Sequence, residues 1–504
     1  MTILSPAAQF CRDCGQTHFS RDHAQLWAEL SPRPLDWVNP DGAKPMGPYS
    51  LSPDPVHGVK AVKDPPSPSL LASLPPDLQL LIAQMGGLES VLRATFGQGS
   101  THGNYPNRRK FLQQMLIGAL LMGTANCGQQ EASELDPSTA FGRLEKTHLK
   151  IAYLPIACAT PIIMAEPLGF YEKYGLKVEL VKMNGWPQVR DAAMAGELDA
   201  YHMLSPMPLA MSLGLSATAT PIKLASIENI NGSAITVALR HRDRLQQVAD
   251  LRGFRIAVPY IYSMHNLLLR YHLASGGIHP DRDAELIVLP PPEMLSNLEA
   301  GTIDAMVAPE PFNQMAVEQG VGFIHRLTRQ LWPGHPCCAF ATSEAWMRQY
   351  PSTFRAVNKA IIDSTNYASQ PQNRRAAAQA VAPAAYLNVP LAALESVFTG
   401  EFNDGLGNRQ NIPDRIDFDP YPWKSFSYWI TTQLQRWGFL TPGNWQHEAI
   451  ADDVFMTGLA RQLSKELGQN PPSLILRFED LAYDRFDPSE PEQYLQAQID
   501  RWDF

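Results

Sequence analysis

The sequence FRIAVPYIYSMHNLLLRYHL at residues 254–273 combines a short strand with the helix that follows it. Residues 256–258 form an apolar run that predicts a buried strand, which Pro259 ends. Ser263 is a suitable helix N-cap, and apolar residues follow it at helical spacing: Met264, Leu267, Leu268 and Tyr271. A helix start beyond a strand presents free N–H groups where open α/β folds bind ligands. Such turns are more often only structural, but we interpret this one as part of a site for a small anion.

Strands and helices alternate on both sides of this stretch, which predicts an α/β fold from His148 onward. We expect strands at 149–156, 177–183, 200–204, 223–227, 234–239, 255–258, 285–289, 305–307 and 337–342. Helices are expected between them, for example at 161–174, 187–195, 292–300 and 311–319. The chain should then be mainly helical to about residue 467, and the acidic and aromatic end should lie over the surface as a tail.

An internal repeat predicts that this body has two similar lobes. AGELDA at 195–200 matches AGTIDA at 300–305, and Ser205-Pro206 matches Glu310-Pro311 at the same offset. In each copy a helix ends at Gly, a strand follows Asp-Ala, and Pro starts the next helix. The alternative is chance similarity between two common turns. We favour two lobes that face each other across a cleft.

The N-terminal part of the chain has a different character. Residues 1–105 are rich in Pro, Ser and Gly and show little periodicity, so we expect a poorly ordered leader. Two thiols and two imidazoles within it suit a tetrahedral zinc site, but their close spacing also fits isolated polar residues: Cys11, Cys14, His18 and His23.

Residues 106–127 have the anatomy of an export signal, and a polar linker follows at 128–147. Paired arginines precede a short apolar run, and small residues precede Cys127, as in twin-arginine and lipoprotein signals. Thr124 stands where lipoprotein signals usually have Leu, and a short buried helix is the alternative. A signal so far from Met1 suggests a later translation start, for instance at Met85, or an unusual leader.

Composition and missing motifs disfavour several classes of protein. The formal net charge of −9 disfavours a general nucleic-acid or anionic-membrane surface. The six cysteines are scattered and form no disulfide framework. The chain has no G-x-x-x-x-G-K-[ST], H-E-x-x-H or G-x-S-x-G motif, so ATP hydrolysis, zinc proteolysis and hydrolase chemistry lack their usual signatures.

Four strand-to-helix junctions are the candidates for the anion site. They lie at Trp186, Ser205, the Ser263-Met264-His265-Asn266 turn and Glu310. Converging helix starts would hold an anion through backbone N–H groups, with Trp186 as an apolar wall and His265 as a donor. Taken singly, a Trp at such a junction is more often a packing residue, and a lone His is more often satisfied in the core than a ligand.

Two glutamates and two cysteines complicate this interpretation. A carboxylate repels an anion, so Glu310 either caps the following helix, which we favour slightly, or pairs with a cation. If Glu310 or Glu344 reaches the site, a bound calcium ion would make the charges compatible. We expect Cys337 and Cys338 to be buried hydrophobes that point to opposite faces of a strand and do not share a metal.

Six motifs between residues 147 and 465 resemble the cyanobacterial nitrate- and bicarbonate-binding proteins, the solute receptors of ABC importers. They are IACATP at 156–161, HMLSPMP at 202–208, YSMHN at 262–266, PEPFNQ at 309–314, HPCCAF at 335–340 and FDPYPW at 418–423.

The resemblance implies a two-lobed type II periplasmic-binding-protein fold with a hinge and an interlobe cleft. Lobe 1 would comprise 148–232 and 336–467, lobe 2 would comprise 233–335, and 468–504 would be the tail. The family's cleft Trp and His match Trp186 and His265. Nitrate-type members carry Gln after Asn-Gly, whereas Ser233 stands there in this chain. In the bicarbonate binder a glutamate holds calcium, which matches either Glu310 or Glu344.

The resemblance also implies a periplasmic protein, peripheral to the inner membrane, that delivers its anion to a permease driven by a separate ATPase. Two alternatives share the fold class. One is an enzyme, because the Cys337-Cys338 pair resembles part of the longer cysteine motif of thiamine-pyrimidine synthases. The other is a ligand sensor that contacts a regulator through its leader or tail.

Overall fold

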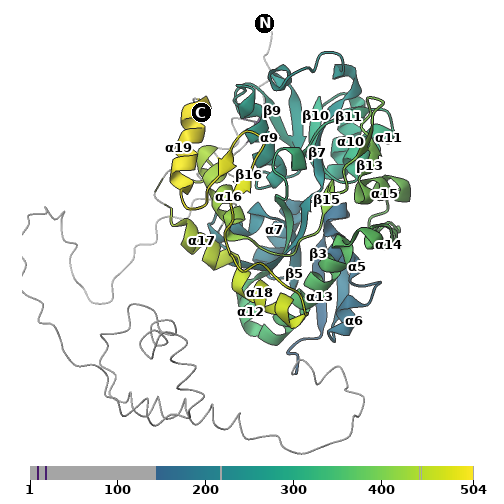
Figure 1. Cartoon of the computed structure of the whole chain (residues 1–504), viewed down its shortest axis with the longest axis vertical. Helices are drawn as coiled ribbons and strands as arrows, with labels where there is room; N and C mark the ends of the chain where they lie inside the picture. Colours follow the sequence, from purple (N-terminus) through teal and green to yellow (C-terminus); the bar gives the residue numbers. More distant parts are fainter. Residues whose placement is uncertain are drawn as a thin grey trace, which may run out of the picture. The chain divides into compact units, whose positions relative to one another are not determined.

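The computed structural model describes residues 8–10, 17–19 and 143–504, except 216, 217, 442, 444 and 503 (Figure 1). Near the N-terminus, β1 (Ala8–Phe10) and β2 (Thr17–Phe19) pair in antiparallel fashion. The expected export signal and most of the leader lie outside the described residues, as do Cys11, Cys14, His23 and the side chain of His18. None of the helices in the described part combines the length and the apolar character that a membrane span requires.

The first of two large sheets has six strands in the order β15-β6-β12-β5-β3-β4. Their bounds are β3 His148–Tyr153, β4 Lys177–Lys182, β5 Ala200–Leu204, β6 Ile222–Asn231, β12 Pro336–Ser343 and β15 Ile416–Asp417. Strand β3 runs parallel to β4 and β5, whereas β12 is antiparallel to β5 and β6. This sheet is the centre of lobe 1.

The second sheet has five strands in the order β11-β7-β10-β8-β9 and is the centre of lobe 2. Its strands are β7 Ser233–Ala238, β8 Arg255–Val258, β9 Glu285–Val288, β10 Ala305–Pro309 and β11 Gly322–Leu327. Strand β8 is parallel to β9 and β10, and β7 is antiparallel to β10 and β11. The expected two-lobed periplasmic-binding fold is confirmed, although β11 was not predicted.

The sequence repeat is a repeat of structure. Ala200 pairs with Ile151 in lobe 1, and Ala305 pairs with Ile256 in lobe 2. The Asp199 carboxylate accepts a hydrogen bond from the backbone N–H of Lys150 at 2.8 Å, and Asp304 accepts one from Arg255 at 3.0 Å. Each aspartate thus fastens the start of one strand to its parallel neighbour. The copies differ in one detail, because Pro311 precedes α11 (Phe312–Glu318) instead of starting it.

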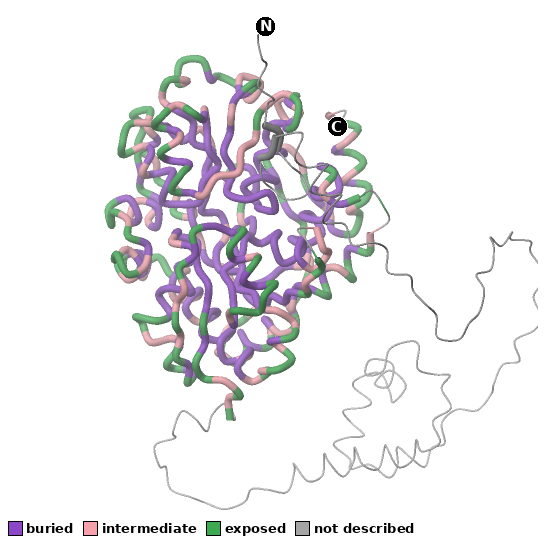
Figure 2. Tube along the Cα trace, turned by 180° about the vertical axis from the view of Figure 1, so that it is seen from behind, coloured by how far each residue is buried: buried purple, intermediate pink, exposed green. Residues whose placement is uncertain are grey.

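Helices cover both sheets, and buried residues run through the interior of each lobe (Figures 1 and 2). Lobe 2 has α9 Met264–Ser275, α10 Pro291–Ala300 and α11. The rest of the body has α5 Thr160–Met164, α6 Phe170–Lys173, α7 Trp186–Ala195, α8 Pro206–Ser212, α12 Glu344–Gln349, α13 Pro351–Ser369, α14 Arg374–Val381, α15 Leu391–Thr399, α16 Lys424–Arg436, α17 His447–Val454 and α18 Thr457–Glu466. The helix expected at 161–174 is two helices, because Gly169 adopts a left-handed conformation between them.

The C-terminal segment, which we expect to lie over the surface as a tail, is folded. It forms a hairpin, β16 (Glu479–Asp480) and β17 (Arg485–Phe486), and then α19 (Pro491–Trp502). Tyr494 and Gln498 of α19 are buried against α16, where the Tyr494 hydroxyl accepts a hydrogen bond from Trp429 at 3.2 Å. An aromatic residue of this segment, Tyr494, therefore packs against the body.

The chain passes from lobe 1 to lobe 2 through one residue, Gly232, between β6 and β7. Its φ of +82° is left-handed, and a Cβ there would lie 2.8 Å from the Asn229 side chain and 2.9 Å from that of Ile416. The second crossing lies beside the first, because the Asn231 N–H donates to the His335 carbonyl at 3.0 Å. Glycine is therefore required at this crossing for conformation and for space.

Replacing Gly232 by alanine tests this constraint. We expect Gly232→Ala to lower the free energy of unfolding by at least about 2 kcal/mol, since backbone strain and overlap add. Gly253→Ala is the matched control, because its φ is +76° and nothing lies within 4 Å of the added Cβ. It should cost about 1 kcal/mol. Equal losses in urea unfolding would show that space at the crossing is unimportant.

His272 predicts a pH dependence of stability. Burial, with His325 and Arg326 nearby, lowers its pKa to about 3, and its Nδ1 lies 2.7 Å from the hydroxyl of Tyr483. The unfolded chain binds a proton at an ordinary histidine pKa, so stability falls as pH drops below that value. We expect His272 alone to contribute a loss of about 2 kcal/mol between pH 7 and pH 5. Urea unfolding should show a smaller loss for His272→Asn and an unchanged loss for a control at the exposed His148, His148→Asn.

Candidate functional site

Several predicted site residues, but not Glu344, lie where strand ends of the two lobes meet. The backbone N–H of Ser205, after β5, donates to the Cys337 carbonyl at the start of β12 at 3.0 Å. From lobe 2, Glu310 accepts a backbone hydrogen bond from Ala157 at 2.9 Å and donates one to Gly232 at 3.0 Å. Residues far apart in sequence are thus fixed around one interlobe position.

Ser233 and His265 form the most direct contact at this position. Ser233 begins β7, and its Oγ lies 2.8 Å from His265 Nε2. The other ring nitrogen of His265 is buried and has no hydrogen-bond partner. Burial lowers the pKa of His265 and thereby favours the neutral ring, which can offer one nitrogen beyond Ser233.

Trp186 and Ser205 contribute further buried polar atoms. Trp186 begins α7 and Ser205 is the N-cap residue of α8, and both are fully buried. Neither Trp186 Nε1 nor Ser205 Oγ has a hydrogen-bond partner. Because buried polar groups are rarely left unpaired, these atoms need a partner.

A buried His202 and Glu228 pair lies beside Trp186 and was missed by the sequence analysis. His202 Nδ1 is 2.6 Å from Glu228 Oε2, and the His202 ring centroid is 6.4 Å from that of Trp186. Burial raises the pKa of Glu228. The remaining polar atom of each side chain is unpaired. His202 is in a motif quoted above, but only the fold brings it to Glu228.

Ser263 and Asn266 form hydrogen bonds that hold the first turn of α9 in place. Ser263 Oγ accepts a hydrogen bond from the Asn266 N–H at 3.0 Å, as its predicted N-cap role requires, and donates to the Tyr260 carbonyl at 2.7 Å. The Asn266 side chain donates to the Ile261 carbonyl and accepts from Arg270. These contacts fix the start of α9 and thereby the position of His265.

Glu310 and Glu344, the two alternatives for a calcium ligand, lie in different environments. Glu310 is fully buried and pairs with Arg415 at 2.6 Å. Glu344 follows β12, next to the surface, and pairs with Lys223 at 3.3 Å. Glu310 lies near the start of β12 at Pro336, whereas Glu344 follows the end of that strand. The length of the strand, about 20 Å, therefore separates the two glutamates.

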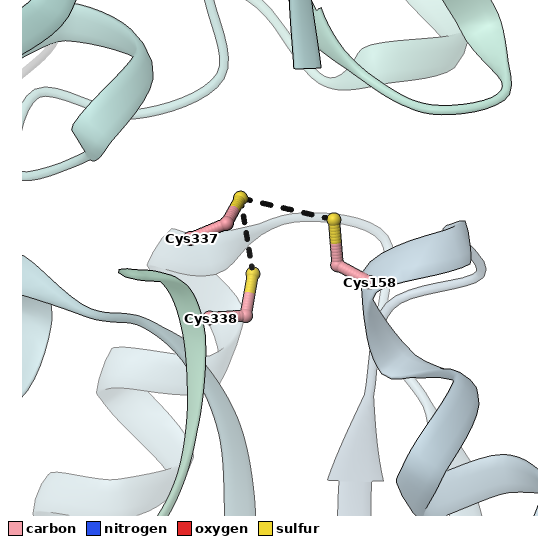
Figure 3. A group of neighbouring side chains, drawn as sticks. All are labelled: Cys158, Cys337 and Cys338. Carbon is pink, nitrogen blue, oxygen red and sulfur yellow. Dashed lines mark hydrogen bonds between the residues drawn. The ribbon is translucent and has the colours of Figure 1, made fainter. Parts of the chain in front are cut away.

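The expectation that Cys337 and Cys338 point apart is wrong. Their Sγ atoms are 3.8 Å from each other, and Cys158 Sγ is 3.8 Å from that of Cys337. Figure 3 shows the three sulfur atoms turned toward one another. The pairing of β12 with β6 is irregular on both sides of Cys338, which breaks the alternation of side chains. Hydrogen bonds from Cys158 and Cys338 hold the pKa of the Cys337 thiol well below its usual value.

Removing the Glu310 charge tests how firmly the lobes are joined. Glu310→Gln leaves the Arg415 guanidinium, which is fully buried, without its charge partner. We expect a loss of about 3–5 kcal/mol in unfolding free energy. Asp243→Asn is the control, because the Arg242–Asp243 pair has side chains 56% and 91% exposed. It should change stability by less than about 1 kcal/mol. A loss at Glu310 as small as the control would contradict the structural role of the pair.

Comparison with known proteins gives consistent matches over most of the described body. The model of the NMT1-like family matches residues 142–382. The nitrate/nitrite-binding protein NrtA of Nostoc sp. is 30% identical over 78% of this chain and 98% of its own length. The bicarbonate-binding protein CmpA of Synechococcus sp. is 27% identical over 78% of this chain and 97% of its own.

Solved structures also match. The crystal structure of the periplasmic nitrate-binding protein NrtA from Synechocystis has a TM-score of 0.67 and 28% identity, and the match covers 70% of this chain and 99% of that one. The nitrate import ATP-binding protein NrtC of Synechocystis is 35% identical over 70% of this chain but only 55% of its own length. Relatives of this chain thus include both a binding protein and a subunit of a nitrate importer.

Proposed function

Because the chain belongs to the family of nitrate/nitrite-binding proteins, we propose that it is the solute-binding component of an ABC importer for a small inorganic oxyanion. Candidates for the anion are nitrate, nitrite and bicarbonate, as the names of its relatives suggest. The relatives that match over nearly their whole length are binding proteins, so we propose binding without chemical transformation.

The observation that carries the proposal is the set of buried, unpartnered polar atoms at helix starts of the two lobes. Trp186 Nε1, Ser205 Oγ and His265 Nδ1 all lack hydrogen-bond partners. They belong to three helix starts, where N–H groups and the helix dipole favour an anion. A small oxyanion accepts several hydrogen bonds at once and would satisfy such donors.

The charge of Glu310 is compatible with this role. The Glu310 carboxylate would repel an anion if it were unpaired, but Arg415 neutralises its charge. The Arg415 guanidinium also donates a hydrogen bond to Gln314 at 2.7 Å. The anion would then be held mainly by neutral donors. Such donors suit an importer, which must release its ligand.

We further propose that the lobes close on the anion by a hinge motion at Gly232 and that the closed form docks on a permease served by an ATPase. The protein would act in the periplasm. Export through the twin-arginine-like segment and lipid attachment at Cys127 complete the proposal, which would place the protein at the inner membrane.

Calorimetric titration of the purified chain with nitrate, nitrite and bicarbonate, each with and without calcium, tests the binding function. We expect at least one anion to bind, and Ser233→Ala/His265→Ala to raise its Kd at least about tenfold, since two contacts are lost. Ser296→Ala/His148→Ala, two exposed positions, is the control and should leave the Kd unchanged. An absence of heat and of any thermal shift with every anion would exclude the proposal.

A further inference from the structure

Three thiols meet at the interlobe position from two separate segments of lobe 1. Cys158 follows β3, and Cys337 and Cys338 lie on β12 (Figure 3). All three are fully buried, and their sulfur atoms lie within 4.8 Å of one another. They are free cysteines. Free cysteines are often buried as small hydrophobes, but three sulfur atoms turned to one point exceed what packing requires.

The spacing of the sulfur atoms matches a metal site. In a tetrahedral zinc site with Zn–S bonds of about 2.3 Å, neighbouring sulfurs are about 3.8 Å apart. The Cys158–Cys337 and Cys337–Cys338 sulfur separations are both 3.8 Å. A disulfide would require about 2.05 Å, so neither pair is bonded.

We propose that Cys158, Cys337 and Cys338 bind a thiophilic divalent metal ion of the zinc and cadmium class. Three protein sulfurs leave a fourth coordination position open, as zinc sites that bind an exogenous ligand do. On binding, each metal–sulfur bond replaces an S–H bond and the protons leave to the solvent, so no oxidant or reductant is needed.

The surroundings suit such an ion. Ser233 Oγ is 3.7 Å from Cys337 Sγ and also contacts His265, so it links the metal site to the residues proposed for the anion. Nearby, both ring nitrogens of the buried His335 lack partners. The metal site therefore adjoins the proposed anion site, but the inference does not depend on which anion binds.

The test is a cadmium titration of the reduced, metal-free full chain, without any anion. One variant, Cys11→Ser/Cys14→Ser/Cys127→Ser, keeps only the proposed ligands. The reciprocal variant, Cys158→Ser/Cys337→Ser/Cys338→Ser, keeps only the other cysteines. We expect the first to bind one Cd²⁺ per chain with an ultraviolet thiolate-to-cadmium band, and the second to lose that band. No band in the first variant would overturn the proposal.

A second measurement does not depend on altering the proposed ligands. X-ray absorption at the zinc edge of the Cys11→Ser/Cys14→Ser/Cys127→Ser chain, loaded with one Zn²⁺, should show three sulfur neighbours at about 2.3 Å. A shell of nitrogen and oxygen alone would overturn the proposal. Because no anion is present in either experiment, a negative result here is distinct from a failure to bind nitrate or bicarbonate.

Discussion

The buried ion pair between Arg415 and Glu310 is the interaction on which the relation between the lobes depends. Arg415 precedes β15 of lobe 1 and Glu310 follows β10 of lobe 2, and neither is exposed to solvent. Two charges in such a place are tolerated only together, because separation would leave each one desolvated and unpaired. The backbone of Glu310 is bonded to Ala157 and Gly232 as well. Glu310 thus connects the crossing at Gly232, the loop after β3 and the Arg415 side chain of lobe 1, and several candidate site residues lie nearby.

The repeated topology explains why so many polar groups converge there. In each lobe a central parallel pair of strands ends at the lobe interface, and a helix starts just beyond. The aspartates Asp199 and Asp304 hold these pairs in the same register in both copies. Helix starts with unpaired donors therefore come from both sides. His265 and Ser233 come from lobe 2, and Trp186 and Ser205 from lobe 1.

The sequence predicted the repeat, the strands of the central sheets other than β11 and β15, and the capped start of α9, because those depend on local periodicity and capping. It did not predict what long-range packing decides. No sequence pattern around Arg415 indicates that its partner is Glu310. The hairpin before α19 was not predicted, because its segment shows no regular hydrophobic pattern. The cysteines are the clearest case. Strict strand alternation sends Cys337 and Cys338 apart, whereas an irregularity in the pairing of β12, which no local pattern indicates, turns both toward Cys158.

The one-residue connection at Gly232 has a consequence for how this protein family can diversify. A single residue has only two soft torsions, φ and ψ. The neighbouring crossing is bonded to Asn231 twice: the Gly334 N–H donates to the Asn231 side chain, and the Asn231 N–H donates to the His335 carbonyl. The main chain at these two crossings would therefore set the axis of the proposed hinge motion. Side chains around the bound solute can be exchanged without altering that axis. Substitution of these side chains can therefore change which anion is bound, while the proposed closing movement of the lobes stays the same.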